Sequence, residues 1–257
     1  MEQYDPCAQE AFTQVGFDDQ AISGIGMVVP FDFELDAECW RWVPRGASLY
    51  ISRMPVPYGD HSIGDHLLEQ VADIDVICET ARPLSVLEIP AVAYSCTSGS
   101  FRRGLAGEAA ICQALRDVGV PEPRTTSGAL LEALRAMGAR RLAIVSPYTR
   151  DLTSHLLRFL GEAGYEVESC RYMGLTSGIA RVSLDTVRRL LVTMKGTRAD
   201  VVFASCTNLR TFEVIVEAEV ELHRPVLSAN QVTIWSCLRA ADLPLPAIDQ
   251  ALFSVDR

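Results

Sequence analysis

Two stretches of the sequence, AYSCTSGSF (residues 93–101) and FASCTNLRT (residues 203–211), decide how this chain folds. In each stretch a short apolar run leads into the same Ser-Cys-Thr triplet, and further polar or small residues follow. A short apolar run bounded in this way predicts a buried strand that ends in a loop. The pattern therefore places Cys96 and Cys206 just beyond the carboxyl ends of two strands.

The ends of two further strands repeat in the same order along the chain. IGMVVPF (residues 25–31) resembles LAIVSPY (residues 142–148), and each precedes one of the two cysteine triplets. The proline and the cysteine are 66 residues apart in the first copy and 59 in the second. This repetition predicts two α/β units built on one design.

Short apolar runs alternate with segments of helical periodicity, which predicts parallel sheets covered by helices. We therefore expect an α/β fold of two pseudo-symmetric parallel-sheet domains with the active site in the cleft between them. The first domain would comprise residues 21–122 and 226–257, and the second residues 123–225, after an N-terminal tail at 1–20. The expected strands lie within 24–30, 48–56, 85–95, 140–148, 165–174, 199–205 and 224–230, and the expected helices are 61–84, 102–119, 127–139 (with Ser127 as its N-cap), 151–164, 185–196, 212–223 and 231–243.

The two cysteines are expected on opposite walls of one cleft, because parallel sheets bind ligands at the carboxyl ends of their strands. A thiol just before a helix lies near backbone N–H groups that stabilise a thiolate. Two opposed thiols suit proton removal on one face and return on the other, or addition to an activated double bond. Neither route requires a metal or an organic cofactor. The donors beside the thiols, which predict a bound carboxylate, are Thr97, Ser98, Thr207 and Asn208.

The composition narrows the class of partner. The chain has 257 residues, 49% of them hydrophobic, and a net charge of −10, which argues against nucleic acid or an anionic membrane surface as the main partner. No apolar run approaches the ~18–20 residues of a membrane span, and the first twenty residues do not resemble a signal peptide. Eight cysteines without a CxxC pair favour reduced thiols in the cytoplasm, and the four histidines show no spacing typical of a metal site.

The same motifs carry a family resemblance, together with residues 125–148, 159–167 and 224–235. The chain resembles the aspartate/glutamate racemase superfamily, most closely its maleate cis–trans isomerase and arylmalonate decarboxylase branch. The resemblance implies a cofactor-independent isomerase or racemase of a small carboxylic acid. It implies that Cys96 is the nucleophile and that Cys206 handles the proton. The decarboxylases of this branch lack the first cysteine, so the presence of both favours an isomerase.

Further residues match the family by position, and two amides are missing. Tyr148 corresponds to a tyrosine that binds the substrate carboxylate, and Thr97 and Ser98 match carboxylate-binding hydroxyls. Maleate isomerases carry an asparagine shortly after the first VVP, where this chain has Phe31 and Asp32 after Pro30. A second asparagine is also absent, and Thr176 and Ser177 stand in its region. The acid and the missing amides predict a substrate with one carboxylate and a cationic or amide-bearing remainder.

The segments VPFDFELD (residues 29–36) and WRWVP (residues 40–44) also resemble proteins of this branch associated with ectoine breakdown, which implies a diaminobutyrate derivative as substrate. The family resemblance implies a homo-oligomer, a dimer. Two alternatives remain open. One is a cofactor-free decarboxylase of a malonate-type acid that uses Cys206, and the other is a carboxylate-binding protein without catalytic activity.

Overall fold

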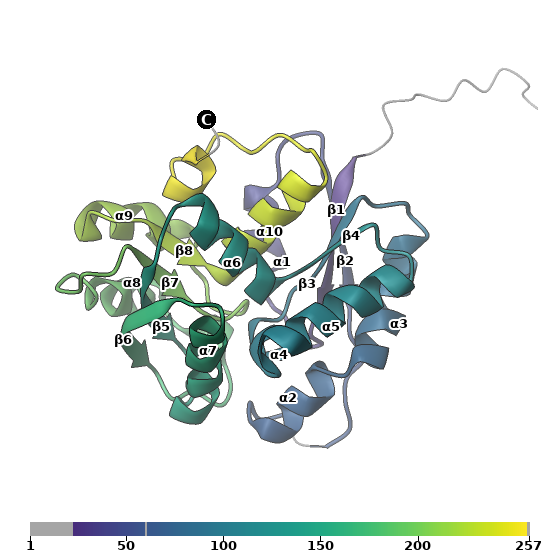
Figure 1. Cartoon of the computed structure of the whole chain (residues 1–257), viewed down its shortest axis with the longest axis horizontal. Coiled ribbons are helices and arrows are strands. Elements are labelled where there is room, and N and C mark those ends of the chain that lie inside the picture. The colour runs from purple at the N-terminus through teal and green to yellow at the C-terminus, as the bar shows by residue number, and fades with distance from the viewer. Residues whose placement is uncertain (1–22, 60, 256–257) are drawn as a thin grey trace, which may run out of the picture.

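The computed structural model describes residues 23–59 and 61–255, which form two parallel α/β domains (Figure 1). The expected tail at 1–20 lies outside the described residues. The strand order is β2-β1-β3-β4 in the first sheet and β6-β5-β7-β8 in the second, with every pair parallel. The second order repeats the first position for position, so the predicted pseudo-symmetric fold is confirmed. The strands are β1 (Gly24–Val29), β2 (Ser48–Arg53), β3 (Ala91–Tyr94), β4 (Glu122–Thr125), β5 (Arg141–Ser146), β6 (Glu166–Tyr172), β7 (Val201–Ala204) and β8 (Val226–Ser228).

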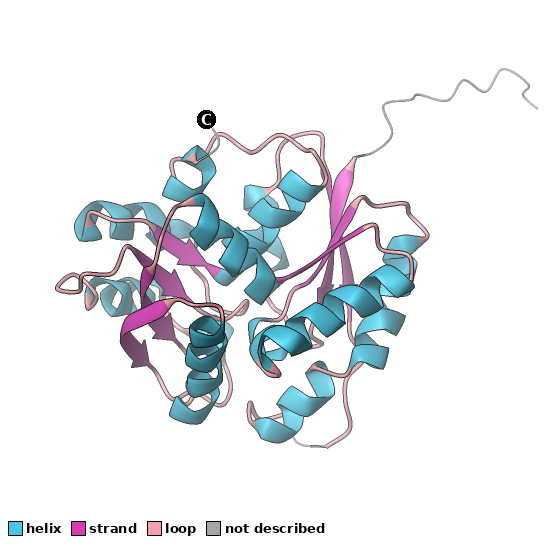
Figure 2. Ribbon diagram, viewed as in Figure 1, coloured by secondary structure: helices cyan, strands magenta, loops and turns pink. Residues whose placement is uncertain are grey.

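Helices flank both sheets and also lie between them (Figure 2). The α-helices are α1 (Asp36–Cys39), α2 (Asp65–Val71), α3 (Ile74–Ser85), α4 (Thr97–Phe101), α5 (Gly104–Asp117), α6 (Thr126–Ala136), α7 (Arg150–Glu162), α8 (Leu184–Val192), α9 (Phe212–Leu222) and α10 (Ala229–Ala240). The described residues also form three 3₁₀ turns, η1 (Trp40–Trp42), η2 (Ile179–Arg181) and η3 (Ala251–Ser254). Across residues 23–59 and 61–255, no helix has both the length and the apolar character needed to cross a membrane.

The central strands are covered on both faces, which explains their continuous apolar sequences. Every residue of β1, β3 and β7 is buried. Helix α6, which follows the first sheet, packs against α10, which follows the second, and α10 also contacts β1, β3 and β4 of the first sheet. The two helices thereby lie between the sheets and join the domains (Figure 1).

The chain passes between the sheets slightly later than the expected boundaries at 122 and 226. Strand β4 pairs with β3 through Thr125, so the first sheet continues to that residue. Strand β8 pairs with β7 through Ser228, so the return to the first domain comes after β8 and begins with α10.

Three local expectations differ from the structure. The helix expected over 61–84 is two helices, because the Asp73 side chain accepts hydrogen bonds from the backbone of Asp75 and Val76 and starts α3 anew. The polar sequence of β4 does not predict a strand. The sheet tolerates Pro123 within it because β4 lies at a sheet edge. The N-cap of α6 is Thr125, whose Oγ1 accepts from the Gly128 N–H at 2.9 Å, and not Ser127.

Candidate active site

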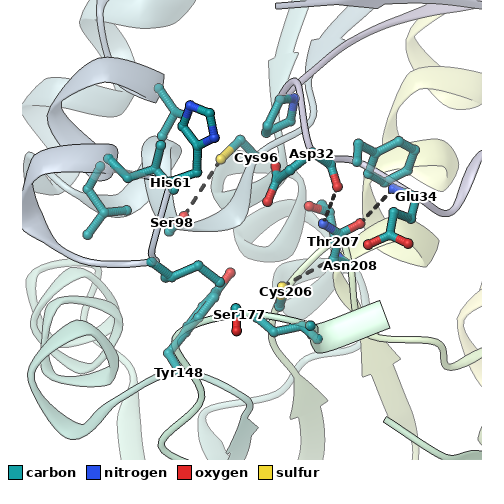
Figure 3. A pocket seen from close by; sticks show the side chains of 18 residues that line it. Asp32, Glu34, His61, Cys96, Ser98, Tyr148, Ser177, Cys206, Thr207 and Asn208 are labelled. Atoms are coloured by element: carbon teal, nitrogen blue, oxygen red, sulfur yellow. Dashed lines mark hydrogen bonds between the residues drawn. The ribbon is translucent and has the colours of Figure 1, made fainter. Parts of the chain in front are cut away.

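One cavity of about 210 Å³ lies between the two domains (Figure 3). It is built on the loops that follow the two central strands of each sheet, namely β1 and β3 in the first and β5 and β7 in the second. Both cysteines follow their strands at the same interval, two residues beyond the last strand residue. The predicted site residues that line the cavity are Pro30, Asp32, Cys96, Ser98, Tyr148, Cys206, Thr207 and Asn208.

Cys96 is fixed at the beginning of a helix in the first domain. It is the N-cap of α4, and its Sγ accepts from the Gly99 backbone N–H at 3.4 Å. The Ser98 hydroxyl lies 3.7 Å from the same sulfur (Figure 3). The thiol is therefore held by the first turn of the helix and points into the cavity beside a hydroxyl group.

Cys206 enters the cavity from the second domain in an unusual backbone conformation. Its φ is +89°, a region that residues other than glycine seldom adopt. Its Sγ accepts from the Asn208 backbone N–H at 3.4 Å. A strained backbone at a buried cysteine persists only where the surrounding structure enforces it, and such strain concentrates at functional sites.

Burial opposes ionisation of both thiols, although each lies near backbone N–H groups that stabilise a thiolate. It raises the pKa of Cys96, and it raises the pKa of Cys206 to about 12. Hydrogen bonding from Gly99 and Ser98 lowers the pKa of Cys96, but burial outweighs it. Both residues are therefore thiols at neutral pH, and the donors stabilise the thiolate only when it forms.

Tyr148 is a buried phenol in the cavity lining, close enough to both cysteines to interact with each. Burial raises its pKa well above the ordinary value, so the hydroxyl remains protonated and able to donate. Hydrogen bonding from this hydroxyl lowers the pKa of Cys206, and Ser98 is its other polar neighbour. Tyr148 can therefore serve a thiolate or a substrate carboxylate.

Two predicted site residues do not line the cavity. Thr97 is buried beneath it, and among the described residues its hydroxyl has no hydrogen-bond partner. Because α4 begins at Thr97, neighbouring side chains diverge around the helix, and Ser98 alone faces the cavity. Phe31 turns toward a separate apolar groove with Met54 and Val76, and its ring packs on that of His61 at 5.0 Å between centroids.

Several lining residues were not predicted from the sequence. One group comprises His61, Ile63 and three apolar side chains of α2, and a second comprises Ser177, Gly178 and Ile179; the α2 residues are Leu67, Leu68 and Val71. Ser177, which stands in the region of the second missing asparagine, lines the cavity. Thr176 does not, although its carbonyl accepts from the Ile63 N–H at 2.8 Å and joins the two loops.

The cavity is acidic. Asp32 and Glu34 both line it, and none of the lining residues is a lysine or an arginine. Burial raises the pKa of Asp32, and the guanidinium of Arg53, which lowers it, is bound to the Phe33 carbonyl and to Asp36. His61 is the basic side chain among the lining residues. No group of three or more potential metal ligands occurs among the described residues.

The glycine after Ser98 is required by packing. Gly99 lies inside α4, and a Cβ at this position would overlap the hydroxyl of Tyr94, which donates to the Val71 carbonyl. We expect Gly99→Ala to lower the free energy of unfolding by about 1–3 kcal/mol, because Tyr94 is fully buried and must move. Thermal unfolding measures this. Gly161→Ala in α7, where a Cβ meets nothing within 4 Å, is the control and should be neutral or stabilising.

A buried carboxylate beside the site makes stability depend on pH. Glu38 accepts from the backbone N–H of Thr211 at 3.2 Å, yet burial raises its pKa from 4.5 to about 7. A raised carboxyl pKa lowers stability as pH rises from about 4.5 to about 7, here by about 3 kcal/mol. Glu38→Gln should remove this loss. In urea unfolding, the free energy of unfolding of the variant should therefore increase relative to that of the wild type between pH 5 and pH 8. A difference that stays constant with pH would contradict the assignment.

Comparisons with known proteins agree with this arrangement. A family model of arylmalonate decarboxylases matches residues 62–252. The chain is 33% identical over 174 residues to the arylmalonate decarboxylase of Bordetella bronchiseptica, a match that covers 66% of this chain and 72% of that protein. It is 30% identical over 184 residues to the maleate isomerase of Pseudomonas putida strain KT2440, covering 68% and 74%.

Solved structures give the same result. A doubly substituted, liganded arylmalonate decarboxylase superposes with a TM-score of 0.78 and 31% identity, over 85% of this chain and 92% of that one. The maleate isomerase Iso of Pseudomonas putida S16 shares the fold, with a TM-score of 0.81 and 24% identity over 90% and 98% of the two chains. The chain therefore belongs to the arylmalonate decarboxylase and maleate isomerase branch of the aspartate/glutamate racemase-like superfamily.

Proposed function

We propose that this enzyme is a cofactor-independent isomerase or racemase of a small carboxylic acid, with Cys96 and Cys206 acting from opposite sides of the substrate. The observation that carries the proposal is the placement of two buried thiols in one cavity, one from each domain. Both lie two residues beyond a central strand. The relatives include isomerases and decarboxylases, which supports carbon-acid or enoate chemistry in this family.

The hydroxyls around the thiols supply a carboxylate site. Ser98 lies beside Cys96, Thr207 directly follows Cys206, and Tyr148 lines the same cavity near both cysteines. A carboxylate held by these donors would present its neighbouring carbon between the two sulfurs. The donors would also take up the negative charge that develops on the carboxylate when a carbanion or enolate forms.

Two reactions fit this geometry, and both balance without an oxidant or a reductant. In a racemase, one thiolate takes the proton from the carbon next to the carboxylate, and the opposite thiol returns a proton to the other face. In an isomerase, the Cys96 thiolate bonds to one carbon of the double bond, the electron pair moves onto the carbon beside the carboxylate, and Cys206 delivers a proton to that carbon. The resulting single bond rotates, the Cys206 thiolate takes the proton back, and the electron pair expels the Cys96 thiolate and restores the double bond in the trans form.

The acidic end of the cavity limits the substrate. A dicarboxylate would place its second carboxylate beside Asp32 and Glu34, with no lysine or arginine among the lining residues. We therefore propose a substrate with a single carboxylate and a cationic or amide-bearing remainder. An acetylated diaminobutyrate derived from ectoine has one carboxylate, one ammonium group and one amide, and it meets this description.

Decarboxylation is the second candidate, and a specific feature favours it. Ile63, Leu67, Leu68 and Val71 form an apolar wall of the cavity. A carboxylate held against such a wall is desolvated without compensation, which favours its loss as carbon dioxide. In this reaction Cys206 alone would protonate the resulting carbanion, and Cys96 would not be required.

Proton NMR in D₂O tests the proposal. The protein is incubated with maleate, aspartate, glutamate, phenylmalonate and acetylated diaminobutyrate. Loss of the α-proton signal identifies a racemase, and a shifted vinyl pair identifies a cis–trans isomerase. Release of carbon dioxide from phenylmalonate identifies a decarboxylase. No turnover of any compound, combined with binding seen as shifts in the protein spectrum, would contradict a catalytic function toward these acids.

A further inference from the structure

The side chain of Asn208 makes two hydrogen bonds between the domains. Its Nδ2 donates to the Asp32 carbonyl at 2.9 Å, and its Oδ1 accepts from the Glu34 N–H at 2.9 Å (Figure 3). The amide thus both donates to and accepts from the backbone of a single loop in the first domain. The sequence suggested Asn208 as a donor to the substrate carboxylate, but its amide is directed toward this loop.

The same residue is also connected to the thiol of Cys206. The backbone N–H of Asn208 donates to the Cys206 sulfur at 3.4 Å, and Cys206 has a φ of +89°. This conformation costs free energy, and it requires neighbours that leave the loop no alternative. The Asn208 side chain supplies such a constraint, because it fixes the residue two positions after Cys206 to the opposite wall of the cavity.

Other contacts hold the two ends of this loop. The Asn230 Nδ2 donates to the Thr207 carbonyl at 2.8 Å, and the Thr211 hydroxyl donates to Glu38 at 3.1 Å. Both partners lie in elements that pack on the first domain. Asn208 differs from them because it contacts the loop that carries Asp32 into the cavity. It therefore links the position of an acidic cavity residue to the position of a thiol.

We propose that Asn208 is a positioning residue that holds Cys206 in its left-handed conformation and at a fixed position relative to Asp32. Asn208 is then not a ligand of the substrate. Its importance for turnover rests on the proposed role of Cys206. Its effect on the thiol does not, because the geometry is present without substrate.

Alkylation of Cys206 tests this inference without turnover. In a Cys96→Ser background, iodoacetamide labelling of each cysteine is followed by mass spectrometry. We expect Asn208→Ala to raise the labelling rate of Cys206 at least tenfold, because the released loop exposes the thiol and relieves the burial that raises its pKa. Cys237, fully buried in α10, is the internal control and should stay unreactive.

An unchanged Cys206 rate, or equal acceleration of Cys206 and Cys237, would overturn the proposal, since the first means no positioning and the second means general unfolding. If Asn208→Ala does not fold, Asn208→Asp is tested in the same way, because it keeps the acceptor for the Glu34 N–H and loses the donor to Asp32. Where an active substrate is known, positioning lowers kcat with little change in KM, whereas a lost substrate ligand raises KM. If Cys206→Ser retains full turnover, the proposed reaction fails, while the alkylation result still decides the role of Asn208.

Discussion

Replacement of Cys206 by serine is expected to lower turnover by about 10²–10⁴-fold, the usual contribution of a positioned acid or base. The serine hydroxyl preserves size and hydrogen bonding but ionises at far higher pH than a thiol. The Cys206 pKa of about 12 means that this residue rests as a thiol, and a thiol is the form that delivers a proton to a carbanion. Both the isomerase and the decarboxylase therefore require it.

Cys96→Ser separates the two reactions. An isomerase or racemase loses activity to the same extent with either substitution, because each face of the substrate needs its own sulfur. A decarboxylase loses activity only with Cys206→Ser. The NMR assay in D₂O gives both rates, and the matched control is Cys170→Ser, a half-buried cysteine in β6 outside the cavity. Full activity in both catalytic variants would contradict any role of the thiols.

The sequence predicts the part of the site that depends on strand ends. A buried apolar run followed by polar residues specifies where a strand stops, and a parallel sheet places all such stops at one edge. Cys96, Tyr148, Cys206 and Asp32 follow central strands, so their meeting in one cavity could be inferred from order alone. The pseudo-symmetric fold follows from the same repeated junctions.

The remaining features depend on contacts between distant segments. Asn208 contacts the Asp32 loop across 176 residues of sequence, and no local pattern specifies that partner. The apolar wall comes from α2, whose inner face is decided by how the helix packs. Thr97 and Ser98 are equivalent as hydroxyls in the sequence. Because α4 begins at Thr97, only the Ser98 side chain faces the cavity.

The second large effect is expected from Asp32→Asn. Asp32 places a carboxylate in the cavity near both sulfurs, and its charge raises the pKa of each thiol. Two unit charges about 4 Å apart interact by about 4 kcal/mol at an effective dielectric constant of 20. Allowing for partial exposure, we expect the neutral amide to strengthen binding of maleate by about 10–100-fold, an effect smaller than that limit. Acetylated diaminobutyrate should bind more weakly to the same variant, because its ammonium group loses its attraction to the Asp32 carboxylate.

Opposite changes for the two ligands distinguish a change in charge from a disturbed site, which would weaken both. Titration calorimetry in a Cys96→Ser/Cys206→Ser background measures the dissociation constants without turnover. Asp32→Asn should also fold well, because burial already disfavours the ionised form and raises the pKa of this carboxyl. Glu217→Gln is the matched control, because this exposed carboxylate lies in α9 outside the cavity and its loss should leave both dissociation constants unchanged. If maleate binds more tightly with Asp32 in place than in Asp32→Asn, both in this background, the cavity accepts a dianion despite its acidic residues. The proposed substrate class is then wrong.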